Sequence, residues 1–131
     1  MISSSRRLAT DISSLISDKF SAVMFQSNSI FTLTNVAMRN SYCSSSSCLG
    51  GALAIFNSYG SIVFSEFTNN NCQSSGGAIG LVNLNGNTTI SQTFITNNTS
   101  SDGNGGGLAY ITNINSNVLK ISQSFIESNS A

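Results

Sequence analysis

The acidic residues are the first candidates for chemistry, because two carboxylates on one face can act as an acid–base pair in glycan cleavage. Glu66 and Glu127 are offset by −1 and +2 from Phe67 and Phe125, which predicts that their side chains face different directions. No Asp-Asp pair and no cluster of basic residues lies beside them. The chain has no His, which excludes a Ser or Cys nucleophile with a His base. We therefore expect no enzymatic activity. The acids are Asp11, Asp18, Glu66, Asp102 and Glu127.

The three cysteines are the next candidates. A zinc site needs about four Cys or His ligands, so the sequence predicts no metal and no cofactor. In an exported protein, Cys43–Cys72 or Cys48–Cys72 would form a disulfide. The repeat described below places Cys72 level with Ser41, so that Cys43 lies beside it on the neighbouring coil. Free thiols in loops are the alternative.

Three asparagines stand in N-glycosylation sequons: Asn87-Thr-Thr, Asn97-Asn-Thr and Asn98-Thr-Ser. On a eukaryotic secretory route each is a candidate acceptor. Sequons also arise by chance in a chain this rich in Asn and Thr, so both interpretations stay open.

Composition narrows the class of protein. Of 131 residues, 40% are hydrophobic and 8% charged, and the formal net charge is zero. Nucleic-acid binding usually requires a basic surface, and no apolar stretch approaches the roughly 20 residues that span a bilayer. We expect no nucleic-acid partner and no membrane span in this segment. Abundant Ser, Asn, Thr and Gly favour turns between short apolar strands.

A repeat organises these residues. Ile90-Ser-Gln-Thr-Phe94-Ile95 matches Ile121-Ser-Gln-Ser-Phe125-Ile126, 31 residues later, and weaker copies align on Phe67 and Val36. A glycine pair opens an apolar run at three places, which are Gly50-Gly51, Gly76-Gly77 and Gly106-Gly107. Linked elements that recur in order every 27 to 31 residues indicate a solenoid.

The units suit a right-handed parallel β-helix of about four rungs, each with three short strands. Stacking would place Val36, Phe67, Phe94 and Phe125 in one internal column. Ile90 and Ile121 lie an even four residues earlier and would share its face. An Asp at position 94 would then abolish cooperative folding. The glycine pairs fit tight corners. Residues 21–131 form the β-helix, and residues 1–20 form either a short capping helix or a degenerate first rung.

The motifs Gly50-Gly-Ala-Leu53, Gly76-Gly-Ala-Ile79, Phe67-Thr-Asn-Asn70 and Phe94-Ile-Thr-Asn97 resemble the repeats of chlamydial polymorphic outer membrane proteins. Similar repeats occur in surface proteins of some protists. The resemblance implies a pectin lyase-like β-helix in a secreted, membrane-linked or cell-surface protein, often linked to adhesion. Glycans or surface proteins are the implied partners.

The pattern calls for another glycine pair after Ala131, so we expect further rungs beyond the C-terminus. A non-catalytic structural or adhesive segment is the main hypothesis. The alternative is a fragment of a polysaccharide-acting β-helix enzyme, a lyase or glycoside hydrolase, whose catalytic rungs lie elsewhere.

Overall fold

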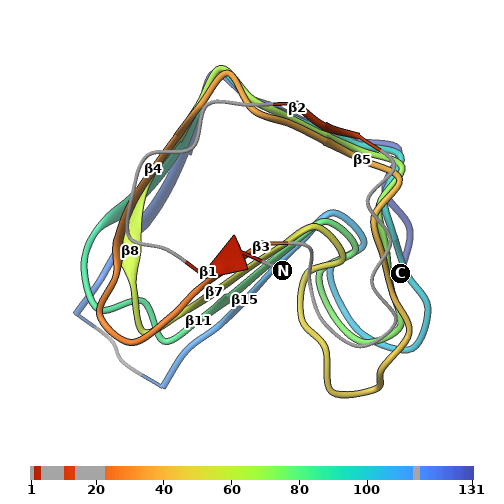
Figure 1. Cartoon of the computed structure of the whole chain (residues 1–131), viewed down its shortest axis with the longest axis horizontal. Helices are drawn as coiled ribbons and strands as arrows, with labels where there is room; N and C mark the ends of the chain where they lie inside the picture. Colours follow the sequence, from red (N-terminus) through yellow and green to blue (C-terminus); the bar gives the residue numbers. More distant parts are fainter. Residues whose placement is uncertain (1, 4–10, 14–22, 114–115) are drawn as a thin grey trace.

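The computed structural model describes residues 2–3, 11–13, 23–113 and 116–131. These residues form an all-β solenoid of about four turns, in which every strand pairs with the equivalent strand of the neighbouring coil in parallel. Figure 1 looks along the stack, so that successive coils lie over one another. No helix is found among the described residues. The predicted parallel β-helix is confirmed.

Each complete coil contains four strands, one more than predicted, and the fourth has only two residues. Such a strand is too short to give an apolar run in the sequence. The coils are β3 (Val23–Phe25), β4 (Ile30–Thr34), β5 (Ala37–Arg39), β6 (Tyr42–Cys43); β7 (Leu53–Phe56), β8 (Tyr59–Val63), β9 (Glu66–Thr68), β10 (Asn71–Cys72); β11 (Ile79–Val82), β12 (Thr88–Ser91), β13 (Phe94–Thr96), β14 (Thr99–Ser100); and β15 (Leu108–Ile111), β16 (Leu119–Ser122), β17 (Phe125–Glu127).

Stacking produces four parallel sheets. Two short strands precede these coils, β1 (Ile2–Ser3) and β2 (Asp11–Ser13). We name the sheets of the described strands sheet A (β1-β3-β7-β11-β15), sheet B (β4-β8-β12-β16), sheet C (β2-β5-β9-β13-β17) and sheet D (β6-β10-β14). Within the predicted N-terminal segment, β1 (Ile2–Ser3) pairs with β3 and β2 (Asp11–Ser13) pairs with β5. The rest of residues 1–20, for which the sequence predicts either a capping helix or a degenerate rung, lies outside the described residues.

Sheets A, B and C enclose the hydrophobic core, and equivalent inward side chains form columns along the stack. Leu53, Ile79 and Leu108 share one column of sheet A. Ile90 pairs with Ile121 in sheet B, as predicted. Ile90 is fully buried, whereas Ile121 is 39% exposed because β16 is the edge strand of its sheet.

The predicted phenylalanine column is wrong. The inward column of sheet C contains Met38, Phe67, Ile95 and Ile126, because Phe67 pairs with Ile95 instead of Phe94. A one-residue shift in a strand moves a side chain to the opposite face. Phe94 and Phe125 pair with each other, but they point outward.

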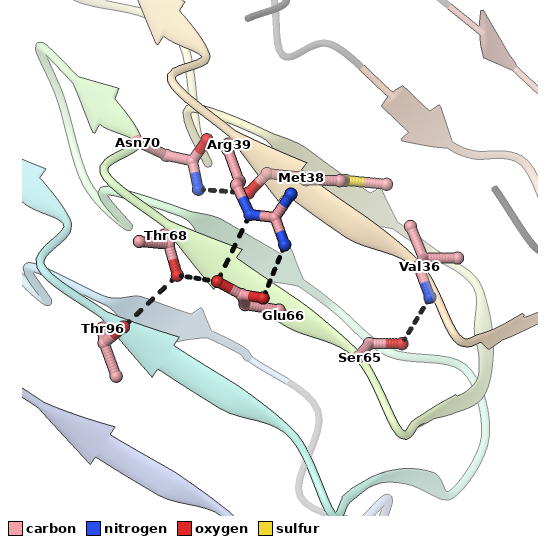
Figure 2. Close-up of polar contacts among 8 residues, drawn as sticks. All are labelled: Val36, Met38, Arg39, Ser65, Glu66, Thr68, Asn70 and Thr96. Atoms are coloured by element: carbon pink, nitrogen blue, oxygen red, sulfur yellow. Dashed lines mark hydrogen bonds and ion pairs between the residues drawn. The ribbon is translucent and has the colours of Figure 1, made fainter. Parts of the chain in front are cut away.

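Two further parts of that prediction also change. Val36 is buried, but it lies at the corner before sheet C, where its N–H donates to the Ser65 hydroxyl (Figure 2). Ile90 and Phe94 lie on different strands with a corner between them, so an even spacing did not keep them on one face. The expectation that an Asp at position 94 abolishes folding therefore loses its basis.

The asparagine corner after sheet C holds a ladder of buried amides. Asn98 Nδ2 donates to the Phe67 carbonyl at 2.9 Å, while Asn98 Oδ1 accepts from the Asn70 backbone N–H at 2.8 Å. Asn70 and Asn129 make the equivalent bonds to the carbonyls of Met38 and Ile95. The residue just before each ladder amide has left-handed φ, as in Asn69 and Asn97. Each coil is thereby tied to the next through a satisfied polar network.

The glycine corner excludes side chains for two reasons. The corners contain the glycine pairs Gly50–Gly51, Gly76–Gly77 and Gly105–Gly106. The first glycine of each pair has a left-handed backbone φ of 71–74°. At the second position, a Cβ would lie 2.4 Å from a carbonyl oxygen of the next coil at Gly51 and 1.9 Å at Gly77.

The third corner pair is therefore Gly105–Gly106, one residue earlier than the predicted Gly106–Gly107. Gly107 occupies the place held by Ala78, because both lie directly before paired strand residues.

The outer face of sheet A is covered by the chain segment that enters the glycine corner. A Cβ on Gly80 would lie 2.8 Å from the Leu49 side chain and 2.8 Å from the Gly50 backbone nitrogen. Ala54 and Gly80 are both buried although they point away from the core. The small outward residues of this sheet are thus required by close approach of the covering segment.

Candidate functional site

None of the described segments covers the outer face of sheet C in this way, and the face carries two columns of outward side chains. One column contains Ala37, Glu66, Phe94 and Phe125, and the other contains Arg39, Thr68, Thr96 and Glu127. Their order follows from the parallel register, since residues two apart on a strand share a face. This face is the candidate functional site.

Three exposed phenylalanines define its character. The rings of Phe94 and Phe125 stack with centroids 5.2 Å apart and an angle of 7° between planes, although the side chains are 50% and 56% exposed. Phe64, at the corner before β9, is 54% exposed and has a left-handed φ of 50°. Asn35, Gln92 and Gln123 have left-handed φ at the equivalent corners.

A groove of about 410 Å³ lies between Phe64 and Phe94, within the size range of about 300–1,000 Å³ typical of small-ligand sites. Ala37 and Val36 contribute apolar surface, and the amides of Asn35 and Gln92 contribute polar groups. The complete lining is Asn35, Val36, Ala37, Phe64, Ser65, Glu66, Gln92 and Phe94.

A charged network borders the groove. Figure 2 shows the Arg39 guanidinium reaching across from β5 to Glu66 on β9, with Nη2 at 2.8 Å from Oε2 and Nε at 3.3 Å from Oε1. The Thr68 hydroxyl donates to Glu66 Oε1 at 2.9 Å and lies 3.3 Å from the Thr96 hydroxyl. Both charged side chains are about one-third exposed. The pair holds the carboxylate in one orientation beside the aromatic groove.

The hydrogen bond from Arg39 is the main reason that the pKa of Glu66 lies below its ordinary value of 4.5. Partial burial opposes this by favouring the neutral acid, while the Thr68 hydroxyl and the Arg39 charge reinforce the lowering. At neutral pH Glu66 is ionised and paired.

The two glutamates on this face correct a prediction. Glu66 and Glu127 both point outward from sheet C, whereas the sequence predicted different directions. They lie two coils and two residues apart, which strand geometry converts to about 12 Å between their backbones. Among the described residues, no group of three His, Cys, Asp or Glu side chains is arranged to hold a metal ion.

The cysteines form one buried cluster, but their pairing differs from the prediction. The disulfide joins Cys43 to Cys48 within one coil, so neither Cys43–Cys72 nor Cys48–Cys72 is present. Cys72 is a buried free thiol. Cys43 and Cys72 are register partners on β6 and β10, so their predicted proximity on neighbouring coils is confirmed.

The sequons divide into accessible and inaccessible sites. Asn87 and Asn97 are exposed and stay predicted acceptors. Asn98 is fully buried in the amide ladder, where its Nδ2 donates to the Phe67 carbonyl and to Asn129 Oδ1 and its Oδ1 accepts from the Asn70 N–H, so it cannot carry a glycan in the folded protein. Asn97 and Asn98 are adjacent in the sequence, and the sequon motif does not show which of the two is buried in the fold.

Comparison with known proteins identifies no relative. No family model, no curated protein and no solved structure matches the chain. The resemblance to polymorphic outer membrane protein repeats therefore stays a prediction, and the site must be interpreted from its own residues. A search of the described residues for a helix long and apolar enough to cross a membrane found none.

Proposed function

We propose that this chain is a non-catalytic structural and adhesive repeat segment of a cell-surface or secreted protein, and that the outer face of sheet C binds a neutral glycan. The observation that carries the proposal is the aromatic groove. Among the described residues, every exposed phenylalanine lines this face or its margin, namely Phe64, Phe94 and Phe125.

Fold stability does not account for Phe64, and it accounts only in part for Phe94 and Phe125, whose stacked rings are half exposed. Phe64 adopts a left-handed backbone conformation, which costs a residue with a side chain about 1–2 kcal/mol. Asn tolerates this conformation better, and Asn35 occupies the equivalent corner one coil earlier. An exposed ring also gains little of the free energy that burial provides. A binding role explains why an aromatic residue occupies an unfavourable position.

The groove offers what a sugar ring requires. A pyranose ring presents a face of C–H groups that packs against an aromatic ring, while its hydroxyls need donors and acceptors at the rim. The carboxamides of Asn35 and Gln92 supply both, and so does the Thr96 hydroxyl. Because Arg39 and Glu66 neutralise each other, the site favours a neutral glycan over an acidic one.

An extracellular or cell-surface location fits two further observations. Disulfides such as Cys43–Cys48 persist in oxidising compartments. The accessible sequons at Asn87 and Asn97 suit a secreted protein.

Further parallel coils are proposed as partners of the edge strands β15, β16 and β17. Their stacking would cover inward-column side chains such as Ile121 and Ile126, which are 39% and 46% exposed.

The alternative is a fragment of a polysaccharide-acting enzyme whose catalytic coils lie outside this chain. It is favoured by the presence of Glu66 and Glu127 on the same face. Their backbones lie about 12 Å apart, so both side chains would have to turn toward each other to bring the carboxyl groups within the roughly 5–9.5 Å found in glycosidases. Glu66 is also neutralised by Arg39, which disfavours it as a general acid.

Calorimetric titration with soluble hexasaccharides of glucose, N-acetylglucosamine and mannose tests the proposal, with a galacturonic acid hexasaccharide as the acidic comparison. We expect Phe94→Ala and Phe64→Asn to weaken the Kd for a neutral hexasaccharide by about tenfold. Tyr42→Ala is the matched control, because Tyr42 is 40% exposed but lies on sheet D.

Binding that persists unchanged in both groove variants, or the absence of binding to all neutral hexasaccharides, would contradict the glycan proposal. Chromatography of the sugars after incubation tests whether Glu66 and Glu127 of this chain act on the glycan themselves, because shortened products would show cleavage and contradict a non-catalytic segment.

A further inference from the structure

The buried cysteine cluster has three sulfur atoms but only one disulfide. Cys43, Cys48 and Cys72 are all buried, with at most 5% exposure. Cys43 and Cys48 lie in one coil, and Cys72 belongs to the next. Neither the fold nor the proposed glycan site uses the third sulfur.

The third sulfur contacts one particular member of the disulfide. Cys72 Sγ lies 3.6 Å from Cys48 Sγ, and the Cys72 thiol also donates to the Cys48 carbonyl oxygen at 3.4 Å. Burial raises the pKa of the Cys72 thiol above its ordinary value of 9.0, so the neutral thiol is the resident form. The cluster therefore contains a protected thiol in contact with a disulfide.

We infer that Cys48 is shared between two mutually exclusive disulfides, Cys43–Cys48 and Cys48–Cys72, which interconvert by thiol–disulfide exchange within the folded protein. After the Cys72 thiol loses its proton, the thiolate attacks Cys48 Sγ. The Cys48–Cys72 bond forms, the Cys43–Cys48 bond breaks, and Cys43 leaves as a thiolate that takes up a proton. The number of thiols and disulfides is unchanged, so the step needs no oxidant or reductant.

The two disulfides constrain the chain differently. Cys43–Cys48 closes a loop with a sequence separation of 5, entirely within one coil. Cys48–Cys72 spans 24 residues and cross-links two neighbouring coils beside sheet D. It would also anchor the segment that leads through Leu49 to the outer face of sheet A. Exchange thus converts a local loop closure into a bond along the solenoid axis.

Folding should change the ratio of the two disulfides, Cys48–Cys72 and Cys43–Cys48. In the unfolded chain the shorter loop is favoured about tenfold, because loop-closure probability falls as about the 3/2 power of loop length. In the folded chain Cys48 Sγ is already bonded to Cys43 and in contact with Cys72, so this entropic preference disappears. The ratio of Cys48–Cys72 to Cys43–Cys48 should therefore be about tenfold higher in the folded protein than in the unfolded protein.

Disulfide mapping of the full chain measures this ratio. The oxidised protein is equilibrated at mildly alkaline pH, once in buffer and once in 6 M guanidinium chloride. It is then quenched with acid, alkylated and digested without reduction, and mass spectrometry identifies the free cysteine. We expect Cys43 and Cys72 both to be found free in the folded sample, with Cys48 always bonded. A ratio that is equal or lower in the folded sample would overturn the inference, as would a folded sample containing Cys43–Cys48 alone or any Cys43–Cys72.

A variant supplies an independent outcome. Cys43→Ser removes the competing partner, so Cys48–Cys72 should form in a glutathione and glutathione disulfide buffer. Cys72→Ser is the matched control, because it retains Cys43–Cys48. Two free thiols in a Cys43→Ser protein that still unfolds cooperatively would contradict the inference. Should that variant not fold, the wild-type ratio decides the question.

Discussion

Phenylalanine has a different role on each face of sheet C. On the inner face it fills the core, and on the outer face it stays partly exposed. Phe67 points inward, is fully buried and belongs to a column continued by Met38 and Ile95. Phe94, on the next strand, points outward and stacks on Phe125 while half of its surface remains exposed. Parallel in-register coils place like residues above like on either face. The face on which a stack lies determines how much of it is buried. An inward stack stabilises the core, whereas an outward stack stays half exposed and accessible to a ligand.

The same distinction applies to ring stacking itself. Phe25 and Phe31 stack in the core with centroids 5.0 Å apart, almost the same distance as in the outer pair. Both core rings are about 1% exposed. Similar geometry therefore accompanies very different burial, and burial supplies most of the stabilisation.

Placing a charge at position 67 or position 94 gives the largest expected contrast. Phe67→Asp should abolish cooperative unfolding, because an unpaired carboxylate would enter the core. Phe94→Asp should retain a cooperative transition, since its side chain faces solvent, with a loss of about 1 kcal/mol from the outer stack. Urea denaturation followed by circular dichroism checks both.

A milder pair of variants controls for the introduced charge. Phe67→Ala should cost about 3–5 kcal/mol and Phe94→Ala about 1 kcal/mol. Comparable losses at the two positions would show that the assignment of faces is wrong.

The neighbouring asparagines give the next contrast. Asn98→Ala should cost about 2–4 kcal/mol, because it leaves the Phe67 carbonyl and the Asn70 N–H buried without their partners. Asn97→Gly should change stability by less than about 0.5 kcal/mol, since Asn97 is exposed and its left-handed φ suits glycine. Thermal unfolding of the two variants measures the difference. A loss for Asn98→Ala as small as that expected for Asn97→Gly would show that the ladder adds little to stability.

This contrast also explains what the sequence could and could not predict. The repeat, the parallel β-helix and the first two glycine corners followed from spacing, because equivalent residues must recur once per coil. The third corner lies one residue earlier than its predicted place at Gly106–Gly107. The register of sheet C did not follow from the Phe-x-x-Asn pattern. Phe67 lies three residues before the ladder residue Asn70, whereas the residue three before Asn98 is Ile95.

Phenylalanine itself was the misleading signal, because Phe67 is buried in the core whereas Phe94 and Phe125 point outward. Ile126 also precedes Asn129 by three residues, so an apolar residue followed three later by asparagine was the usable pattern. The outward aromatic face could not be predicted without that register. The Cys43–Cys48 pairing was missed because residues 44–47 form an irregular loop, whose path no repeat determines.

The ion pair on the outer face should give the smallest effect. Because Arg39 lowers the pKa of Glu66 in the folded state, the pair contributes stability above the ordinary carboxyl pKa of 4.5 and loses it as the pH falls through the lowered value. Both side chains are about one-third exposed, so solvent screening limits the contribution at pH 7 to less than about 1 kcal/mol.

Arg39→Gln should therefore lower the Tm slightly at pH 7 and leave it unchanged in strong acid, where Glu66 is protonated in both proteins. An NMR titration should show the pKa of Glu66 rising toward its ordinary value in the variant. Lys120→Gln, which removes an equal charge from the outer face of sheet B, is the control and should leave that pKa unchanged. If Arg39→Gln lowered the Tm by the same amount at pH 7 and at pH 2, the arginine would act through packing of its side chain. The ion pair with Glu66 would then add nothing to the stability of sheet C.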